Sequence, residues 1–191
     1  KAETSKLKEL DLNNIPFGKY FTDHMLEADF ENGEWKNVEI KPYQPLLFQP
    51  SLAVFHYGQA IFEGIKAYRG KDGKVAIFRP YDNFHRFNIS ARRMNMPEMP
   101  EEIFIHGIKQ LVKLDEKWVP EGKDHALYIR PFMIATDTVL GGTKNYIEIY
   151  CNDNALMCNI TPTDILNTYF LDEEGMDDVV ISEMLPAKLG W

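Results

Sequence analysis

The chain has 191 residues, 45% of them hydrophobic and 26% charged, a composition typical of a globular protein with one good core or two small ones. Its net charge of −8 argues against nucleic acid as the main partner, because phosphate binding requires a basic patch. No apolar run approaches the roughly 18 residues of a membrane span, and residues 1–12 lack the apolar core of a signal peptide. We therefore expect a cytoplasmic protein without a membrane or nucleic-acid partner.

The metal-binding and nucleophilic residue types are few and scattered. Cys151 and Cys158 are too few for a disulfide framework and are not spaced as in a zinc knuckle, so we predict reduced thiols in a reducing compartment. The five histidines form no ligand pair such as HExxH and are interpreted as structural. No P-loop, GxGxxG or Ser-His-Asp signature is present. We expect no metal site.

The first 50 residues predict an arm, a hairpin and a loop. Residues 1–16 are polar, and residues 17–30 form an extended segment with aromatic content. Asn32-Gly33 is the strongest short hairpin signal, and residues 35–40 would be the returning strand. Three prolines at positions 42, 45 and 50 favour an extended loop or edge segment rather than a helix.

The next stretch, residues 54–68, is rich in aromatics and contains Gly58 and Gly64 beside bulky neighbours. A glycine in such a place often marks a tight bend or a close backbone approach. Composition alone favours an ordinary buried junction between a helix and a strand. Residues 64–69 and 74–79 then read as a second hairpin, with Asp72-Gly73 supplying the turn.

Two helices and a strand follow. Pro80 is placed to begin the first helix, and prolines 97 and 100 close it. Helical spacing predicts that it buries Phe84, Phe87, Ala91 and Met94, with Arg86 and Arg93 on another face. The second helix should begin at Glu101-Glu102 and end near residue 118, with a core face of Ile103, Phe104, Ile108, Leu111 and Val112. Residues 126–135 form an apolar strand.

Several side chains are candidates for chemistry, each beside an ordinary alternative. Lys66 or Lys144 could form a Schiff base, although most lysines are solvated surface charges. Arg86 could bind phosphate bidentately or lie over the surface of its helix. Tyr128 and Arg130 are two apart on a strand and share a face, where they could line a carboxylate site or flank a sheet edge.

Four segments in order resemble one family: residues 17–26 (FGKYFTDHML), 56–68 (HYGQAIFEGIKAY), 78–86 and 127–131 (LYIRP). They are similar to the branched-chain amino acid aminotransferases, which are pyridoxal-phosphate enzymes of fold type IV. The resemblance covers about residues 15–140, nearly three quarters of the chain. It implies an α/β (α+β) fold, with a small N-terminal α/β domain over residues 1–140 and remnants of a large, incomplete cofactor-binding domain over residues 141–191.

The resemblance also implies roles for individual residues. Arg86 resembles the arginine that holds the phosphate of pyridoxal 5'-phosphate, and Lys66 becomes an ordinary strand residue. The residues that resemble the substrate pocket are four aromatic walls and the arginine of the YxRP segment: Phe17, Tyr57, Phe62, Tyr128 and Arg130. An aromatic-walled pocket suits a branched aliphatic side chain.

After residue 140 the resemblance continues only as short pieces. Residues 141–146 (GGTKNY) resemble the family's Schiff-base segment with its spacers removed, which makes Lys144 the catalytic lysine and Tyr146 a cofactor-binding residue. Ile149 stands where a glutamate would contact the pyridine nitrogen, and the phosphate-binding Gly-Val-Thr and Gly-Thr-Gly turns are absent. Either the sequence omits stretches of a longer enzyme or the protein is truncated. We favour omission, because the pieces alone leave too little chain for a second core.

The function implied is transamination of the branched-chain L-amino acids Leu, Ile and Val with 2-oxoglutarate, giving branched-chain 2-oxo acids and glutamate. This reaction would serve branched-chain amino acid biosynthesis, in a homodimer. One alternative is a catalytically incompetent small domain that acts as a binding or dimerisation module. Another, within the same fold, is a D-amino acid aminotransferase or an aminodeoxychorismate lyase. The segments FTDHML and FEGIKAY favour the branched-chain group.

Overall fold

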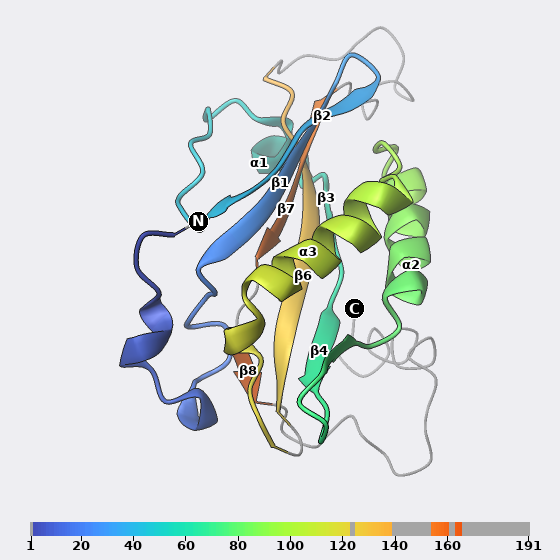
Figure 1. The fold of residues 1–191 in the computed structure, drawn as a ribbon. Helices are drawn as coiled ribbons and strands as arrows, with labels where there is room; N and C mark the ends of the chain where they lie inside the picture. The colour runs from blue at the N-terminus through green and yellow to red at the C-terminus, as the bar shows by residue number, and fades with distance from the viewer. Residues whose placement is uncertain (1, 123–124, 139–153, 161–162, 166–191) are drawn as a thin grey trace, which may run out of the picture.

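The computed structural model describes residues 2–122, 125–138, 154–160 and 163–165. Within these residues, eight strands form one antiparallel sheet, and helices pack across one of its faces (Figure 1). The strands are β1 (His24–Glu31), β2 (Glu34–Pro42), β3 (Ala60–Phe62), β4 (Ile65–Arg69), β5 (Val75–Ile77), β6 (His125–Ala135), β7 (Asn154–Ile160) and β8 (Thr163–Ile165). The main order is β2-β1-β7-β6-β4-β5, and both β3 and β8 pair with β6.

Both predicted hairpins are confirmed, and the turn residues explain them. In the β1–β2 hairpin, Asn32 and Gly33 have φ angles of 54° and 82°, the left-handed conformation that a tight two-residue turn requires. In the β4–β5 hairpin, Gly73 has a φ of 79°, and the Gly70 N–H donates to the Lys74 carbonyl at 2.8 Å. These turn residues therefore determine two strand pairings that are local in the sequence.

The two predicted helices are also confirmed. Helix α2 (Pro80–Arg93) has its proline in the first turn, where the missing N–H costs no hydrogen bond, and it ends four residues before Pro97. The second helix is composite: a π-helical turn, η3 (Glu102–His106), leads into α3 (Gly107–Leu114), and the short 3-10 helix η4 (Glu116–Trp118) follows. The predicted core positions of this second helix, from Ile103 to Val112, are all buried.

The core lies between these helices and one face of the sheet. Alternate residues of β6 are buried there, among them Leu127, Ile129 and Met133, each with 0% exposure. They pack in one cluster with Phe87 and Phe104 from the helices. Three of the four predicted core residues of α2 are buried, and the fourth, Met94, caps the helix and packs partly against the cluster.

The N-terminal residues, predicted as a polar arm, are attached to the sheet. Two 3-10 helices, η1 (Lys6–Glu9) and η2 (Leu12–Asn14), place leucines against the core, and Ile15 is buried. The backbone N–H of Ala2 donates to His24 Nε2 at 2.9 Å. A sequence pattern of isolated leucines in a charged segment did not indicate this packing.

Strands β7 and β8 come from the range predicted to hold remnants of a second domain. In the structure they pair with strands of the first part of the chain: β7 lies between β1 and β6, and β8 pairs with the start of β6. The division at residue 140 remains a prediction, but these two strands belong to the same sheet. None of the described helices has the length and apolarity that crossing a membrane would require.

Candidate functional site

Tyr128 and Arg130 lie on the sheet face opposite the helices. In β6 the buried residues Leu127 and Ile129 alternate with the half-buried Tyr128 and Arg130, because successive side chains of a strand point to opposite faces. The prediction that these two residues share a face is therefore confirmed. We call this the open face, because α2 and α3 cover the other one (Figure 1).

Arg130 is the centre of a compact group on the open face. Its Nε and Nη2 donate to Tyr128 Oη at 3.1 and 2.6 Å. Its Cζ lies 4.5 Å from the centre of the Phe62 ring, at cation–π distance. Because the Tyr128 oxygen accepts from a cation, its hydroxyl proton is available to another acceptor. The guanidinium and the hydroxyl together offer several donors to one anion.

Phe17 completes this group. Its ring contacts Tyr128 edge to face, with centroids 5.3 Å apart, while 56% of Phe17 and 64% of Phe62 are exposed. Four of the five predicted substrate residues thus meet: Phe17, Phe62, Tyr128 and Arg130, the aromatic–arginine group. The arrangement is an aromatic surface with a fixed cation beside it, which suits a molecule with an apolar part and a carboxylate.

The two glycines of the predicted junction act differently. A Cβ on Gly64 would lie 2.4 Å from Tyr128 Oη, so this glycine does allow a close approach, although of a side chain rather than of the backbone. Gly58 has a φ of 63° and open space where its Cβ would be. It ends α1 (Ala53–Tyr57) in the left-handed conformation that favours glycine, and among the described residues no atom lies within 4 Å of where its Cβ would be.

Arg86, the predicted phosphate ligand, is held by a buried carboxylate. Its Nε and Nη2 donate to the two oxygens of Glu63 at 2.6 and 2.7 Å, and Nη2 also donates to Asn83 Oδ1 at 3.0 Å. Glu63 is only 6% exposed, whereas the Arg86 side chain is 34% exposed. This bidentate pair orients the guanidinium rigidly. Sequence reasoning missed Glu63 and Asn83, since no local pattern pairs Glu63 with a helix that begins many residues later.

The remaining predicted site residues are not members of the aromatic–arginine group. Tyr57 is 43% exposed at the end of α1, and its ring lies beside His56, with centroids 6.5 Å apart. Its role as a pocket wall remains a prediction. Lys144 and Tyr146 lie outside the described residues. Lys66 is a residue of β4, opposite Tyr128 in the sheet.

A second polar network, not predicted from the sequence, ties the N-terminus to β1. His24 Nδ1 lies 2.7 Å from Asp115 Oδ1, and both side chains are buried. Burial acts to raise the pKa of the neighbouring Asp23, but hydrogen bonds from Ser5, from Trp118 Nε1 at 2.9 Å and from the Lys6 N–H, aided by His24, outweigh burial and lower that pKa. This network is structural in character, because every group in it is satisfied by the protein.

The described residues suit two of the anionic groups that the sequence resemblance implies, the cofactor phosphate and the substrate carboxylate. Arg86 is an oriented, partly exposed cation of the kind that binds a phosphate, and Arg130 with Tyr128 suits a carboxylate. Within the same residues, no group of three or more His, Cys, Asp or Glu side chains is arranged to hold a metal ion. The site is therefore one for anions beside an aromatic surface.

Part of the chain is similar in sequence to curated proteins of one family. The chain is 51% identical over 140 residues to a branched-chain-amino-acid aminotransferase of Mycolicibacterium smegmatis, covering 72% of this chain and 38% of that protein. It is 52% identical over 132 residues to branched-chain-amino-acid transaminase 1 of Bacillus subtilis, covering 69% of this chain and 37% of that protein. The chain thus spans less than two fifths of the length of these curated relatives. No protein-family model matches it.

Solved structures show the same fold. The branched-chain amino acid aminotransferase of T.th. complexed with N-(5'-phosphopyridoxyl)-L-glutamate superposes with a TM-score of 0.51 at 24% identity, over 70% of this chain and 39% of that one. The complex of that enzyme with 4-methylvaleric acid gives a TM-score of 0.51 at 26% identity over the same shares. The fold is thus that of the type IV pyridoxal-phosphate enzymes. The matched part of this chain is homologous to the branched-chain-amino-acid aminotransferases, as the sequence motifs predicted.

Proposed function

We propose that the chain provides the substrate-recognising part of a pyridoxal-phosphate transaminase that converts leucine, isoleucine and valine, with 2-oxoglutarate, into branched-chain 2-oxo acids and glutamate. The observation that carries the proposal is the pairing of Arg130 with Tyr128 beside Phe62 and Phe17. Homology to the branched-chain aminotransferases supports it, as does the complex of the T.th. enzyme with 4-methylvaleric acid, a branched carboxylate.

Each part of the group has a distinct task in this proposal. The Arg130 guanidinium and the Tyr128 hydroxyl donate to the substrate carboxylate, which fixes the orientation of the substrate Cα. The exposed rings of Phe17 and Phe62 contact the branched side chain and remove it from water. Selectivity for branched-chain substrates would then follow from apolar contact, and polar groups would discriminate little among leucine, isoleucine and valine.

Three further residues would hold the cofactor and move the proton. Arg86, oriented by Glu63, would bind the phosphate, and Tyr146 would be a second cofactor-binding residue. Bound pyridoxal 5'-phosphate supplies the electron sink that makes the Cα proton of an amino acid labile. The amine of Lys144 would take that proton from Cα and return it to the cofactor side, acting as a general base and then a general acid.

The proposal is tested with the full chain supplied with pyridoxal 5'-phosphate, leucine and 2-oxoglutarate, measuring glutamate and 4-methyl-2-oxopentanoate. Lys144→Ala should abolish turnover and any aldehyde-dependent absorbance band, whereas Lys71→Ala, in the β4–β5 turn, should leave both unchanged. Arg130→Met should raise KM by about tenfold or more, because a carboxylate loses its charged donor. Equal activity of the Lys144 and Lys71 variants would contradict the assignment.

The alternative function is a non-catalytic binding or dimerisation module. Binding and turnover measurements on the same sample distinguish it from the transaminase. It predicts binding of 4-methylvaleric acid, sensitive to Arg130→Met, with no turnover at any cofactor concentration. We also propose that the protein is cytoplasmic and forms a homodimer. Light scattering of the purified chain measures the mass of the assembly directly. A mass equal to one chain of 22.2 kDa at micromolar concentration would contradict the dimer.

A further inference from the structure

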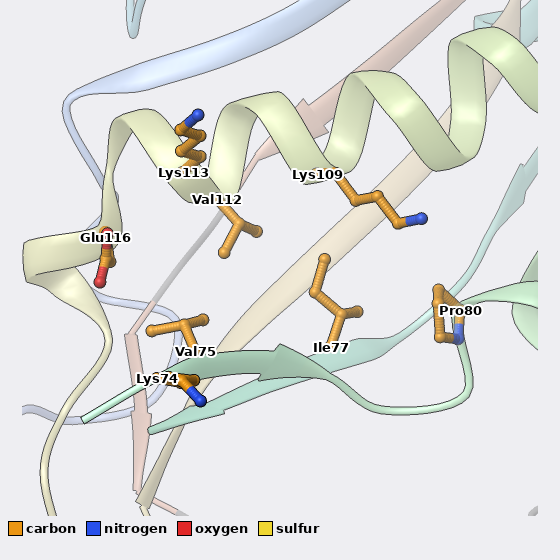
Figure 2. A pocket seen from close by; sticks show the side chains of 8 residues that line it. All are labelled: Lys74, Val75, Ile77, Pro80, Lys109, Val112, Lys113 and Glu116. Atoms are coloured by element: carbon orange, nitrogen blue, oxygen red, sulfur yellow. The ribbon is translucent and has the colours of Figure 1, made fainter. Parts of the chain in front are cut away.

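A groove that shares no residue with the aromatic–arginine group lies between α3 and the β5 edge of the sheet. Its volume is about 550 Å³, within the range of small-molecule sites. Figure 2 shows Val112 of α3 facing Val75 and Ile77 of β5 across the groove, with Pro80 at one end. The remaining lining residues are Lys74, Lys109, Lys113 and Glu116. We call this the lysine groove.

The charges of the lysine groove are mostly positive, although the whole chain has a net charge of −8. Lys74 comes from the β4–β5 hairpin and Lys109 from α3, so two cations stand on opposite sides (Figure 2). Lys109 and Lys113 are one helical turn apart, and like charges at this spacing repel each other. The carboxylate of Glu116 is directed partly elsewhere, 3.5 Å from Arg69 Nη1. Lys74 Nζ lies 3.3 Å from Asp72 Oδ2 in an exposed pair, and Lys109 Nζ lies 5.7 Å from the centre of the Tyr81 ring, so neither cation is held by a buried carboxylate.

The floor of the groove selects among anions. Val112 is 4% exposed, and Val75, Ile77 and Pro80 are half-buried, so the surface between the lysines is aliphatic. The residues that line it include no aromatic ring for stacking a base and no arginine for bidentate phosphate binding. The ammonium groups of Lys74 and Lys109 disfavour a bound cation, whereas the Lys113 side chain points away from the groove (Figure 2). An aliphatic chain with one carboxylate satisfies both the floor and the rim.

We propose that the lysine groove binds an aliphatic carboxylate, with its tail on Val75, Ile77 and Val112 and its headgroup between Lys74 and Lys109. The inference does not depend on the proposed transaminase activity, because the two sites have separate residues. Octanoate is the probe, measured by calorimetry on the full chain carrying Arg130→Met, because the aromatic–arginine group also suits a carboxylate with an apolar part. Octan-1-ol tests the contribution of the charge, and acetate tests that of the tail.

The test variant is Lys74→Gln with Lys109→Gln. Its matched control is Lys71→Gln with Lys117→Gln, two exposed lysines that do not line the groove, one from the same hairpin and one from η4, which follows α3. Both double variants change the net charge equally. All four side chains are exposed, so thermal unfolding should be unchanged and should confirm folding in each case.

The proposal expects octanoate to bind the test variant at least about tenfold more weakly than the control, and acetate and octan-1-ol to bind far more weakly than octanoate. Affinity should fall as salt rises. Arg130→Met, which disrupts the candidate active site, should leave octanoate binding intact and so separates the two sites. Equal affinity in test and control variants, equal affinity for octan-1-ol, or loss of binding in Arg130→Met would overturn the proposal.

Discussion

Along β6, Leu127, Ile129 and Met133 are fully buried beneath the helices, whereas Tyr128 and Arg130 on the open face are half-buried. The covered face is packed into one continuous apolar cluster. The open face presents a cation, a hydroxyl and two exposed aromatic rings. One strand thus supplies both the core and the candidate site, by alternation. We infer that the covered face carries stability and the open face carries recognition, which single substitutions can test.

The largest effect is expected from Phe104→Ala on the covered face. Phe104 is completely buried, and its ring lies 5.2 Å from that of Phe87 and 5.6 Å from that of Phe84. Deleting it leaves a cavity and should lower the free energy of unfolding by about 3–5 kcal/mol. Urea unfolding measures this. The control is Phe62→Ala on the open face, which should change stability by no more than about 0.5 kcal/mol. Similar losses in both variants would contradict the division of roles.

Glu63→Gln tests the link between the two faces. Glu63 follows β3 and is buried, but it orients Arg86 of α2 through two charge-assisted hydrogen bonds. The amide cannot accept at both positions, so the variant should lose about 1–3 kcal/mol of stability and bind pyridoxal phosphate more weakly. Glu98→Gln is the control, because its ion pair with Arg92 is exposed and should contribute at most about 1 kcal/mol. If Glu63→Gln changed neither stability nor the affinity for pyridoxal phosphate, Arg86 would not depend on Glu63 for its orientation.

Gly64→Ala should affect recognition more than stability. The added Cβ would lie 2.4 Å from Tyr128 Oη, so the tyrosine must move away from Arg130. Because the carboxylate then loses an oriented donor, binding of 4-methylvaleric acid should weaken by about tenfold. Calorimetry measures this, and Tyr128→Phe should weaken binding comparably. Unchanged affinity in both variants would remove the hydroxyl from the site.

The smallest effect is expected on the stability of the protein at acid pH, through Asp23. The pKa of Asp23 in the folded chain is below its ordinary value of 3.8, so its stabilising contribution is complete above that value. Below it, the unfolded chain takes up the proton first, and this contribution is lost as the pH falls through the folded pKa. Asp23→Asn should therefore flatten the acid limb of the stability curve, measured by urea unfolding at several pH values below about 5. An identical acid limb in the variant would contradict the assignment.

Local chemistry predicted much of the fold. Asn32-Gly33 and Asp72-Gly73 placed both hairpin turns, because few residues other than glycine and asparagine tolerate a positive φ. The helical spacing from Pro80 onward placed α2 and its buried residues. The packing of the N-terminal leucines, the Glu63–Arg86 pair and the His24–Asp115 pair were not predicted, since each depends on partners distant in the sequence.

For the candidate site, the sequence by itself determined that Tyr128 and Arg130 share a face, because a strand places every second side chain on one side. The motifs also named Phe17 and Phe62. Only the tertiary structure decided that these rings lie in one group with Arg130. Phe62 is placed there because β3 pairs with β6, and Phe17 because the residues before β1 bring its ring against Tyr128 on the open face. Only the tertiary structure showed that Gly64 leaves room for Tyr128 and that Glu63 orients Arg86. Periodicity sets the direction of a side chain, but its partners are set by strand pairing between distant segments.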